Sequence, residues 1–400
     1  MARSERPPAL VIEVGWVNGL GAVRSLGREG VPVIAVDHRP WALGFRSRYA
    51  HRFLAADPLE DEGAFVSALV ELGDAIGRPA VVFPTHDEHL NAIARHREQL
   101  GDRFRYPFPG WEVLEPLQSK RRQLEAAASV GLDVPQTHHP RSAAEARRLA
   151  AEIGFPVLVK PSENVVFKRL YRRQAFLCDD AAQLERAYGL AERYEPMLQE
   201  FIPGGDESLW TLGTYIGADG EVLVRFCGRK LRQTRDNMGS ARIGQALWDD
   251  EVVESGLAVL RELRFHGIAQ VEWKRDPRDG RLKLIEVNPR LWQWHDLASL
   301  CGANVTAAAY NDLVGRRLPQ ARSDGGGRRW AITIMSENGV AVTRPPYRDP
   351  IFSVADPLPG AVHAARFVVN PFRRRPRPDF QRWVRAGGAP PRVANAQSER

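Results

Sequence analysis

The sequence predicts a chain of mixed α/β and α+β architecture that begins with a parallel sheet. Its opening reads as strand, glycine-containing turn, helix and strand, over ALVIEVGWVNGLGAVRSLGREGVPVIAVD, an order typical of parallel α/β sheets. Further along, two long strands, ESLWTLGTYIG and EVLVRFCGRK, and a hairpin that ends in LIEVNPR predict an antiparallel sheet. With 400 residues and 44% hydrophobic content, the chain can form two or three domains with real cores.

The N-terminal sheet is expected to continue beyond its first two strands. A helix around residues 62–76 and a strand at 80–84 extend the alternation of helix and strand. Asp37 closes the second strand at about 20 residues beyond the turn, which would suit a dinucleotide-binding domain. The glycines of that turn do not follow the GxGxxG spacing, however, so NAD binding is kept only as an alternative.

The segment THDEH follows the strand at 80–84 and holds two histidines and two acids. Thr85 and Glu88 have the spacing of a capping box, so we expect a helix to start here. Metal binding by these side chains is the alternative. Asp87 can also face a ligand from the carboxyl end of the strand.

A smaller α+β unit is predicted over about residues 130–200. One helix, over SKRRQLEAAAS, is stopped by Gly131, and a second, over SAAEARRLAAEI, leads into a strand that ends at Lys160. A strand near residues 174–178, a further helix and the strand MLQEFI complete the unit. The two long strands, a helix at about 249–263 and the hairpin follow it.

The hairpin places two acids opposite each other. If GIAQVEWKRDPRDGRLKLIEVNPR folds symmetrically about Asp279, Glu272 lies across from Glu286 and Gln270 lies across from Asn288. Like charges that face each other across a ladder repel, so a positive charge is expected between them. Mg²⁺ would supply it with oxygen ligands. The alternative is that Glu286 and Asn288 are solvated residues on the open face of a one-sided sheet, with Ile285 and Val287 sharing the buried face.

The formal charge of +7 is concentrated in the last 80 residues. Residues 321–400 contain 14 arginines and six acids, a net of +8, which leaves −1 for the first 320 residues. This tail includes PFRRRPRP and ends in AGGAPPRVANAQSER, a composition that predicts a disordered end. Nucleic acid is therefore not the expected partner, although the tail leaves a weak anionic partner as an alternative.

The cysteines and the hydropathy pattern predict a cytoplasmic protein. Three cysteines, far apart and outside any CxxC pair, form neither a disulfide framework nor a zinc site. The N-terminus has only a short apolar run, and no segment is long enough to cross a membrane.

Lysine is rare, since only six of the 56 basic residues are lysines. A chain that uses arginine for generic positive charge keeps lysine where a compact ammonium matters. The six are Lys120, Lys160, Lys168, Lys230, Lys274 and Lys283.

Taken together, these motifs resemble an ATP-grasp enzyme, in particular the carboxylate-amine ligases similar to D-aspartate ligase. The P-loop, HExxH and GxSxG motifs are missing. The resemblance covers about residues 8–315 and implies an N-terminal preATP-grasp domain (1–115) and a two-lobed ATP-grasp domain (116–315, with the small lobe at about 130–200). Residues 316–400 would be a basic C-terminal extension, and a chain cut after Asn370 is expected to keep its activity.

The resemblance also implies the nucleotide site. Lys160 in VLVKPS corresponds to the family's phosphate-binding lysine, and Lys120 in QSKRRQL to the lysine that begins the preceding helix. The segment QEFIPGGDES resembles the hinge that packs against adenine. Its implied contacts are the backbone of Glu200 and Ile202 with Phe201 between them, and the carboxylate of Glu207 on the ribose; as a motif alone, it is an ordinary loop.

The family's magnesium ligands correspond to Glu272, Glu286 and Asn288. Arg290 is similar to the family's arginine near the transferred phosphate and the acyl group. Lys230 and Arg232 in GRKLRQTR resemble the basic segment near the phosphates and the substrate carboxylate, and a solvated charge run, with Arg235, is the alternative.

Two features depart from the family. The loop SENVVFKRLYRRQ after Lys160 lacks the glycines of the usual flap over the triphosphate, although four basic side chains, Lys168, Arg169, Arg172 and Arg173, can supply charge there. Three bulky residues follow the NPR motif, and the sequence leaves open whether they line a pocket or pack in the core: Trp292, Trp294 and His295.

The resemblance implies an ADP-forming ligase with ATP and Mg²⁺, or Mn²⁺ in its place. It would activate a small-molecule carboxylate as an acyl phosphate and join it to an amine, with amino acids as candidate substrates and a homodimer as an option. The alternatives are an ATP-dependent carboxylase of the same fold, an NAD-dependent oxidoreductase and a nucleotide-binding module without turnover.

Overall fold

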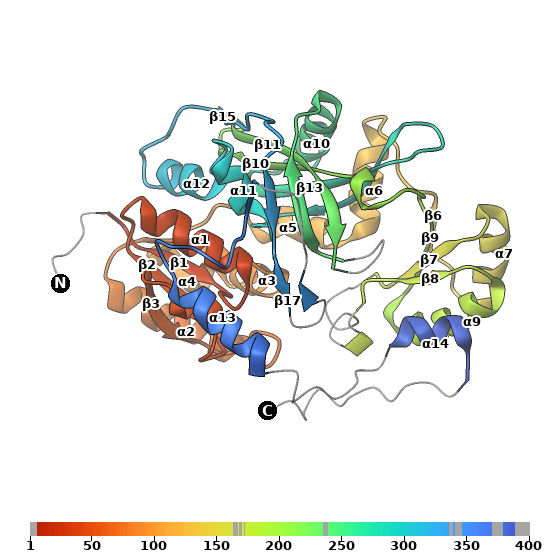
Figure 1. Ribbon diagram of the computed structural model, residues 1–400, viewed down its shortest axis with the longest axis horizontal. Coiled ribbons are helices and arrows are strands. Elements are labelled where there is room, and N and C mark those ends of the chain that lie inside the picture. The colour runs from red at the N-terminus through yellow and green to blue at the C-terminus, as the bar shows by residue number, and fades with distance from the viewer. Residues whose placement is uncertain are drawn as a thin grey trace.

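A computed structural model describes residues 6–162, 167, 170–171, 173–234, 239–335, 339–340, 346–369 and 379–388. Within them, the chain forms a parallel sheet near the N-terminus, a large sheet in the middle and a small sheet to one side (Figure 1). The mixed α/β and α+β class predicted from the sequence is confirmed. No helix in these ranges is long and apolar enough to span a membrane.

The N-terminal sheet has five parallel strands in the order β3-β2-β1-β4-β5. The strands are β1 (Ala9–Ile12), β2 (Val33–Asp37), β3 (Ala50–Leu54), β4 (Ala80–Pro84) and β5 (Phe104–Arg105). The helices and short 3-10 turns are α1 (Val17–Arg28), η1 (Leu43–Arg46), α2 (Glu62–Ile76), α3 (Asp87–Arg95), α4 (Arg97–Leu100), η2 (Gly101–Arg103) and α5 (Trp111–Gln118). Strand β1 is buried along its whole length, as expected for a parallel strand covered on both faces.

Two elements of this domain lie where the sequence predicts them, α2 and β4. Helix α2 starts because the side chain of Asp61 accepts a hydrogen bond from the Ala64 N–H, and it ends at Gly77, which adopts a left-handed conformation with φ 68°. Helix α1 lies close to the end of β1, since a Cβ on Gly19 would lie 2.6 Å from the Glu13 carbonyl oxygen. The turn therefore serves close packing of helix and strand.

The predicted capping box at THDEH is wrong, although the helix α3 does begin there. The residue before the helix is His86, and no side chain caps it. Thr85 is fully buried at the end of β4, and its hydroxyl donates to the Glu13 carbonyl oxygen at 2.7 Å. The threonine thus binds the neighbouring strand end and not the helix.

The large sheet has eight strands among the described residues, in the order β14-β13-β10-β11-β12-β16-β19, with β15 paired to β11. Its strands are β10 (Leu209–Ile216), β11 (Val222–Gln233), β12 (Ala241–Ala246), β13 (Gly267–Arg275), β14 (Leu282–Asn288), β15 (Ala321–Arg322), β16 (Arg329–Ala331) and β19 (Tyr347–Arg348). The helices packed around it are α10 (Asp250–Glu262), α11 (His295–Leu300) and α12 (Val305–Leu313). A two-stranded ladder joins β17 (Ile334–Met335) to β18 (Gly339–Val340).

The predicted register of the hairpin is confirmed at the site. Glu272 pairs with Glu286, and Gln270 pairs with Asn288. The register shifts by one residue between Glu272 and the next position, so Ile285 is an extra residue on β14. The predicted alternation fails at this bulge, because Ile285 lines the cleft and does not share the buried face of Val287.

The small lobe contains a four-stranded sheet in the order β6-β9-β7-β8. Its strands are β6 (Thr137–His138), β7 (Val157–Lys160), β8 (Phe176–Cys178) and β9 (Met197–Glu200). Helix α6 (Lys120–Ser129) leads toward it, α7 (Ala143–Ile153) and α9 (Ala181–Ala191) pack on it, and η3 (Glu192–Tyr194) and η4 (Asp206–Ser208) flank β9. Lys160 stands at the end of β7, as the sequence predicts.

Three hydrophobic cores show which parts of the molecule are packed together. One core joins residues of β1, such as Val11, to Trp292 and Trp294 after β14, and a second joins Leu10 to Trp273 of β13. The small lobe has a core of its own. The N-terminal domain and the large sheet are therefore packed as one body, and the small lobe is packed separately.

The question left open for the bulky residues after NPR has a clear answer. Trp292, Trp294 and His295 have exposed fractions of 1%, 1% and 0%. A Cβ on Gly213 would lie 2.2 Å from the Trp292 ring, so the glycine makes room for the indole. These residues pack mainly in the core, while Trp292 and Trp294 also reach the wall of the cleft.

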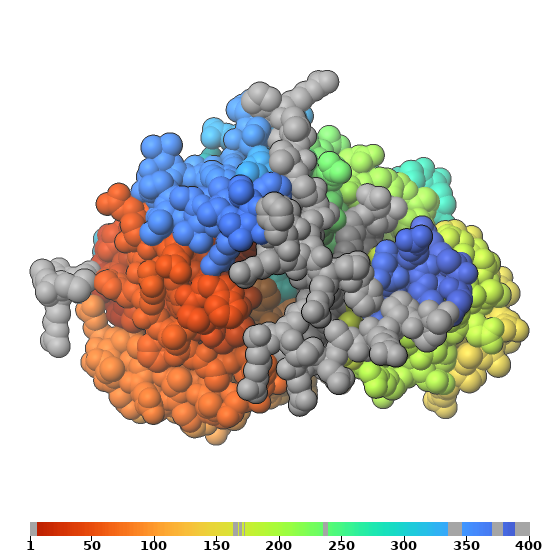
Figure 2. Space-filling model, turned by 60° about the horizontal axis from the view of Figure 1, so that its bottom comes forward, coloured from red at the N-terminus to blue at the C-terminus, as the bar shows by residue number. Residues whose placement is uncertain are grey.

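The C-terminal segment contacts both the N-terminal domain and the small lobe. Helix α13 (Leu358–Val369) packs on η1 of the N-terminal domain, and α14 (Phe380–Ala386) packs on α9 and β8 of the small lobe (Figure 2). A buried ion pair between Arg24 and Asp356, at 2.8 Å, fixes the segment before α13. The expectation that a chain cut after about Asn370 keeps its activity stays a prediction, and such a cut would remove α14, which contributes to a hydrophobic core. The PFRRRPRP run and residues 389–400 lie outside the described residues.

Candidate active site

A cleft of about 440 Å³ lies where the N-terminal domain, the small lobe and the large sheet meet. Four of the six lysines line it, namely Lys120, Lys160, Lys230 and Lys274. The sequence-predicted residues that also line it are Glu200, Phe201, Ile202, Glu272, Glu286, Asn288 and Arg290. Most of the predicted site residues, spread over 170 positions from 120 to 290, thus meet in one place.

The two facing acids are each paired with a lysine. Lys230 Nζ donates to Glu272 Oε2 at 2.9 Å, and Lys120 Nζ lies 3.7 Å from Glu286 Oε2. Gln270 Nε2 donates to the other oxygen of Glu272 at 2.9 Å. The positive charge expected between the acids is therefore present in part as ammonium groups from two other elements, α6 and β11.

The pKa values of the two carboxylates are shifted in opposite directions. Glu272 is only 7% exposed, and the loss of solvation raises its pKa above the ordinary value. The nearby Lys230 charge lowers this pKa, but by less. Burial would also raise the pKa of Glu286, but the Lys120 charge and the hydrogen bond from Asn288 outweigh it, so this pKa lies below its ordinary value. Glu286 is thus the carboxylate that is more firmly ionised.

Lys160 faces the acids from the small lobe. Its Nζ donates to Gln199 Oε1 at 2.6 Å. Desolvation, and then the neighbouring Lys120 charge, lower the pKa of Lys160 to about 7. An anion bound beside this amine would restore its charge, so the position suits a phosphate group.

Arg290 is anchored by the N-terminal domain. Its Nε and Nη2 donate to the two carboxylate oxygens of Asp87 at 2.6 and 2.9 Å. Nη2 also donates to Asn288 Oδ1 at 3.3 Å. Asp87, which the sequence placed at a strand end facing a ligand, instead orients Arg290 beside the acids.

Part of the predicted adenine hinge lies in the cleft. Glu200, Phe201 and Ile202 line it. The Glu200 N–H is taken by the Gln136 carbonyl oxygen at 2.9 Å, and its carboxylate accepts from Lys283 and Arg278, each at 2.7 Å. These bonds tie the end of β9 to the hairpin turn and leave the Glu200 N–H unavailable for a base edge.

Two predicted side chains do not reach the cleft. Glu207 is exposed on η4 and is not among the residues that line the cavity. Arg232 is exposed as well. The register of β11 with β12 shifts between Lys230 and Arg232, and Gln233 is the next residue of the strand that faces the cavity.

Lys274 is a charged residue of the large sheet that lines the cleft and was given no role from the sequence. It is 6% exposed, and its Nζ lies 5.1 Å from the centre of the Phe201 ring. Two signals point to it: it is one of six lysines, and it stands two positions after Glu272, on the same face of β13.

The N-terminal domain also supplies residues that the sequence did not predict. Trp16 and Asn18 line the cleft from the start of α1, and His86 lines it just after β4. In the basic loop after Lys160, Arg173 lines the cleft, and its Nη2 lies 2.9 Å from Asp379 Oδ1. The other basic residues that the sequence placed in this loop, Lys168, Arg169 and Arg172, lie outside the described residues, as does Arg235 of the GRKLRQTR segment.

The fold and this site resemble those of the ATP-grasp superfamily, to which the relatives and the structural neighbours of the chain belong. Among its relatives is D-aspartate ligase of Enterococcus faecium (strain Aus0004), 26% identical over 240 residues that make up 57% of each chain. No family model matches the chain. The sequence-based recognition is thereby confirmed.

Solved structures agree on the fold. Biotin carboxylase from Campylobacter jejuni, in its β-γ-ATP complex, superposes with a TM-score of 0.64 at 16% identity, covering 79% of this chain and 73% of that one. L-amino acid ligase from Bacillus licheniformis gives 0.60 at 19% identity, covering 78% and 75%.

The chain spans only part of its curated relatives. It covers 57% of D-aspartate ligase and 22% to 31% of the carbamoyl phosphate synthase large chains that it also matches.

Proposed function

We propose that the chain is an ATP-dependent ligase that activates a substrate carboxylate as an acyl phosphate and joins it to an amine. The observation that carries the proposal is the pair of Glu272 and Glu286, which face each other across a ladder and line the same cleft as four lysines. Acids suit a hard divalent cation, and lysines suit phosphates. The similarity to D-aspartate ligase supports a ligase.

Glu272, Glu286 and Asn288 are the residues that would hold Mg²⁺, or Mn²⁺ in its place. Their donor set fits such an ion, because it consists of two carboxylates and an amide oxygen on neighbouring strands. When bound, the ion neutralises phosphate charge. Lys120, Lys160 and Lys274 would neutralise the remaining charge of the nucleotide, with adenine packed against Phe201 and Ile202.

The chemistry needs positioning and charge stabilisation, not a protein nucleophile. An oxygen of the substrate carboxylate attacks the γ-phosphorus of ATP, and ADP leaves. The amine then attacks the acyl carbon, phosphate leaves, and an amide forms. Arg290, held by Asp87 beside Asn288, would stabilise the negative charge of the acyl phosphate.

The substrates in this proposal are small molecules such as amino acids. The likeness to D-aspartate ligase supports amino acids as the first compounds to test. We place the reaction in the cytoplasm, because the three cysteines are buried and unbonded, as in a reducing compartment.

The test is a screen of amino acids and small acids for ADP release, repeated with hydroxylamine in place of the amine. An acyl phosphate should be intercepted as a hydroxamate that forms in step with ADP and requires both Mg²⁺ and the carboxylate. Lys160→Ala should abolish both signals. Arg148→Ala, which removes an exposed cation from the same lobe, is the matched control and should leave both unchanged.

Three other outcomes would count against the proposal. Amide formation with AMP and pyrophosphate would place the chemistry at the α-phosphate. ADP release that requires bicarbonate and no other acid would identify a carboxylase. Nucleotide binding without any turnover across the screen would identify a binding module.

A further inference from the structure

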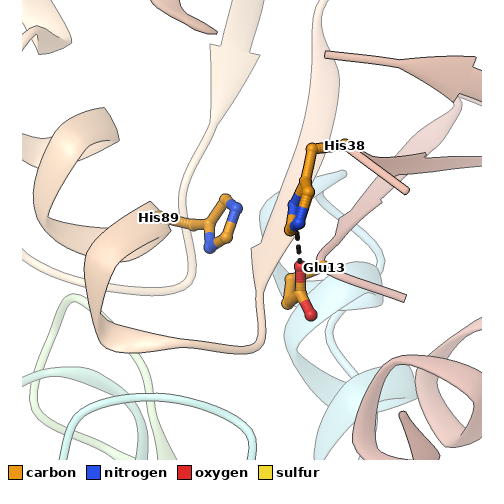
Figure 3. A group of neighbouring side chains, drawn as sticks. All are labelled: Glu13, His38 and His89. Atoms are coloured by element: carbon orange, nitrogen blue, oxygen red, sulfur yellow. Dashed lines mark ion pairs between the residues drawn. The ribbon is translucent and has the colours of Figure 1, made fainter. Parts of the chain in front are cut away.

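A second group of functional side chains lies in the N-terminal domain, outside the residues that line the cleft. Glu13 follows β1, His38 follows β2 and His89 belongs to α3, so all three stand at the carboxyl edge of the parallel sheet (Figure 3). One potential ligand atom from each lies within 4.8 Å of the other two. In the part of the chain that the structure describes, no other group of His, Cys, Asp and Glu meets this spacing.

The backbone at Glu13 is strained. Its φ of 65° lies in the left-handed region, which costs a non-glycine residue ~1 kcal/mol or more. Neighbouring strands hold it there, because its N–H donates to the Val36 carbonyl oxygen at 2.8 Å and its carbonyl oxygen accepts from Thr85. Strain of this kind is kept where a side chain must be aimed at a particular place.

Each member of the group presents a buried atom that makes no hydrogen bond: Glu13 Oε2, His38 Nδ1 and His89 Nδ1. Glu13 and His89 are only 6% and 3% exposed. The distance from Glu13 Oε2 to His38 Nδ1 is 3.8 Å, which is too long for a hydrogen bond. Buried polar atoms without a partner are costly, and a ligand bound within this group could satisfy some of them.

The charges around the group favour a cation. Three carboxylates, those of Glu13, Asp37 and Asp57, are balanced by one guanidinium, that of Arg39, which binds Glu13 and Asp37. With all three acids ionised, these four groups carry a net charge of −2, which a divalent ion would cancel.

We propose that Glu13, His38 and His89 form a binding site for a divalent transition metal ion, with Zn²⁺ as the first candidate. Two imidazole nitrogens and one carboxylate oxygen suit Zn²⁺ better than Mg²⁺, which prefers oxygen ligands. His38 is half-buried and gives access from solvent. Asp57 Oδ2 lies 4.0 Å from His38 Nε2, so its negative charge lies near the imidazole.

A metal ion at this site would also help to hold Arg290 in position in the cleft. His89 lies on the helix that begins at Asp87, the residue that holds Arg290. An ion that joins α3 to the ends of β1 and β2 would therefore fix the anchor of that arginine.

The test is Zn²⁺ binding to the full chain after treatment with a chelator, measured by competition with a chromophoric chelator and by the visible spectrum of a Co²⁺-loaded sample. We expect one ion per chain. Glu13→Gln and His89→Asn should each weaken the affinity by more than about 100-fold. His96→Asn, which changes a histidine paired with Glu62 in the same domain, is the matched control and should bind as the unaltered chain does.

Glu286→Gln separates this inference from the proposed ligase activity, because it alters the cleft and should leave Zn²⁺ binding unchanged. Equal affinity in the unaltered chain, Glu13→Gln and His89→Asn would overturn the proposal, as would the failure of the unaltered chain to bind Zn²⁺. Should the two buried variants fail to fold by circular dichroism, His38→Asn at the half-buried position decides: unchanged affinity there also overturns it.

Discussion

The two sides of the cleft are built in different ways. The acids, Arg290 and Lys230 stand on a large sheet whose cores continue into the N-terminal domain. Lys160 stands on a small sheet with a separate core that is completed by α14, far along the chain. One wall of the site thus shares its hydrophobic cores with the N-terminal domain, whereas the other depends on the smaller core of the small lobe.

The largest expected effect is on the small lobe. Phe380 is 3% exposed within its core, so Phe380→Ala should destabilise this lobe by ~3–5 kcal/mol. Hydrogen exchange should show faster opening of α9 and β8 with little change in β10 and β13. Equal protection in all four elements would contradict the division into two bodies. A chain cut after Gly388 keeps α14 and is the matched control.

A smaller but more specific effect is expected on the large sheet. Glu286→Gln removes a charge from the proposed metal site and should cost ~2–4 kcal/mol of transition-state stabilisation, measured as ADP release at limiting Mg²⁺. The fold should be unaffected. Glu254→Gln, at an exposed position on α10, should turn over as the unaltered chain does. Undiminished turnover by Glu286→Gln would refute its assignment as a ligand.

A smaller loss of activity is expected when the ion pair between Asp87 of the N-terminal domain and Arg290 is weakened. Asp87→Asn weakens a bidentate pair that is only partly buried, and we expect a loss of about 1–2 kcal/mol in kcat/KM. Asp74→Asn breaks an ion pair with Arg103 on the surface of the same domain and should have no effect. Equal losses in both variants would show that the Arg290 anchor is not specific.

The smallest expected effect is the uptake of a proton when nucleotide binds. The pKa of Lys160 is lowered to about 7 in the free chain, and bound phosphates would raise it. Above pH ~7, nucleotide binding should therefore take up a proton, and affinity should fall as the pH rises. Calorimetry in buffers of different ionisation enthalpy measures the uptake. Its persistence in Lys160→Ala would assign the proton to another group.

The local pattern of the sequence was sufficient for the centre of the site. Alternation along β13 and β14 put Glu272 opposite Glu286, and the end of a predicted strand put Lys160 in place. The register holds at the acids only because a bulge adds Ile285 to β14. A turn-centred argument cannot predict such a bulge, since it arises from how the strand packs.

Other features depend on contacts between distant residues and could not be predicted. Arg232 fails to reach the cleft because β11 shifts its register against β12. Thr85 bonds to Glu13, 72 residues away, and so does not cap its own helix. The packing position of helix α14 could not be predicted without knowing that it contacts α9. In each case the deciding partner lies far along the chain, where periodicity carries no information.

The scarcity of lysine has a practical consequence. Because four of the six ammonium groups line the cleft, a reagent that acylates amines acts on this protein largely as a label for one location. Lys160 is the most reactive candidate, since an amine with a lowered pKa is partly uncharged, and therefore nucleophilic, near neutrality. Protection from labelling would report cleft occupancy directly, without any knowledge of the substrate.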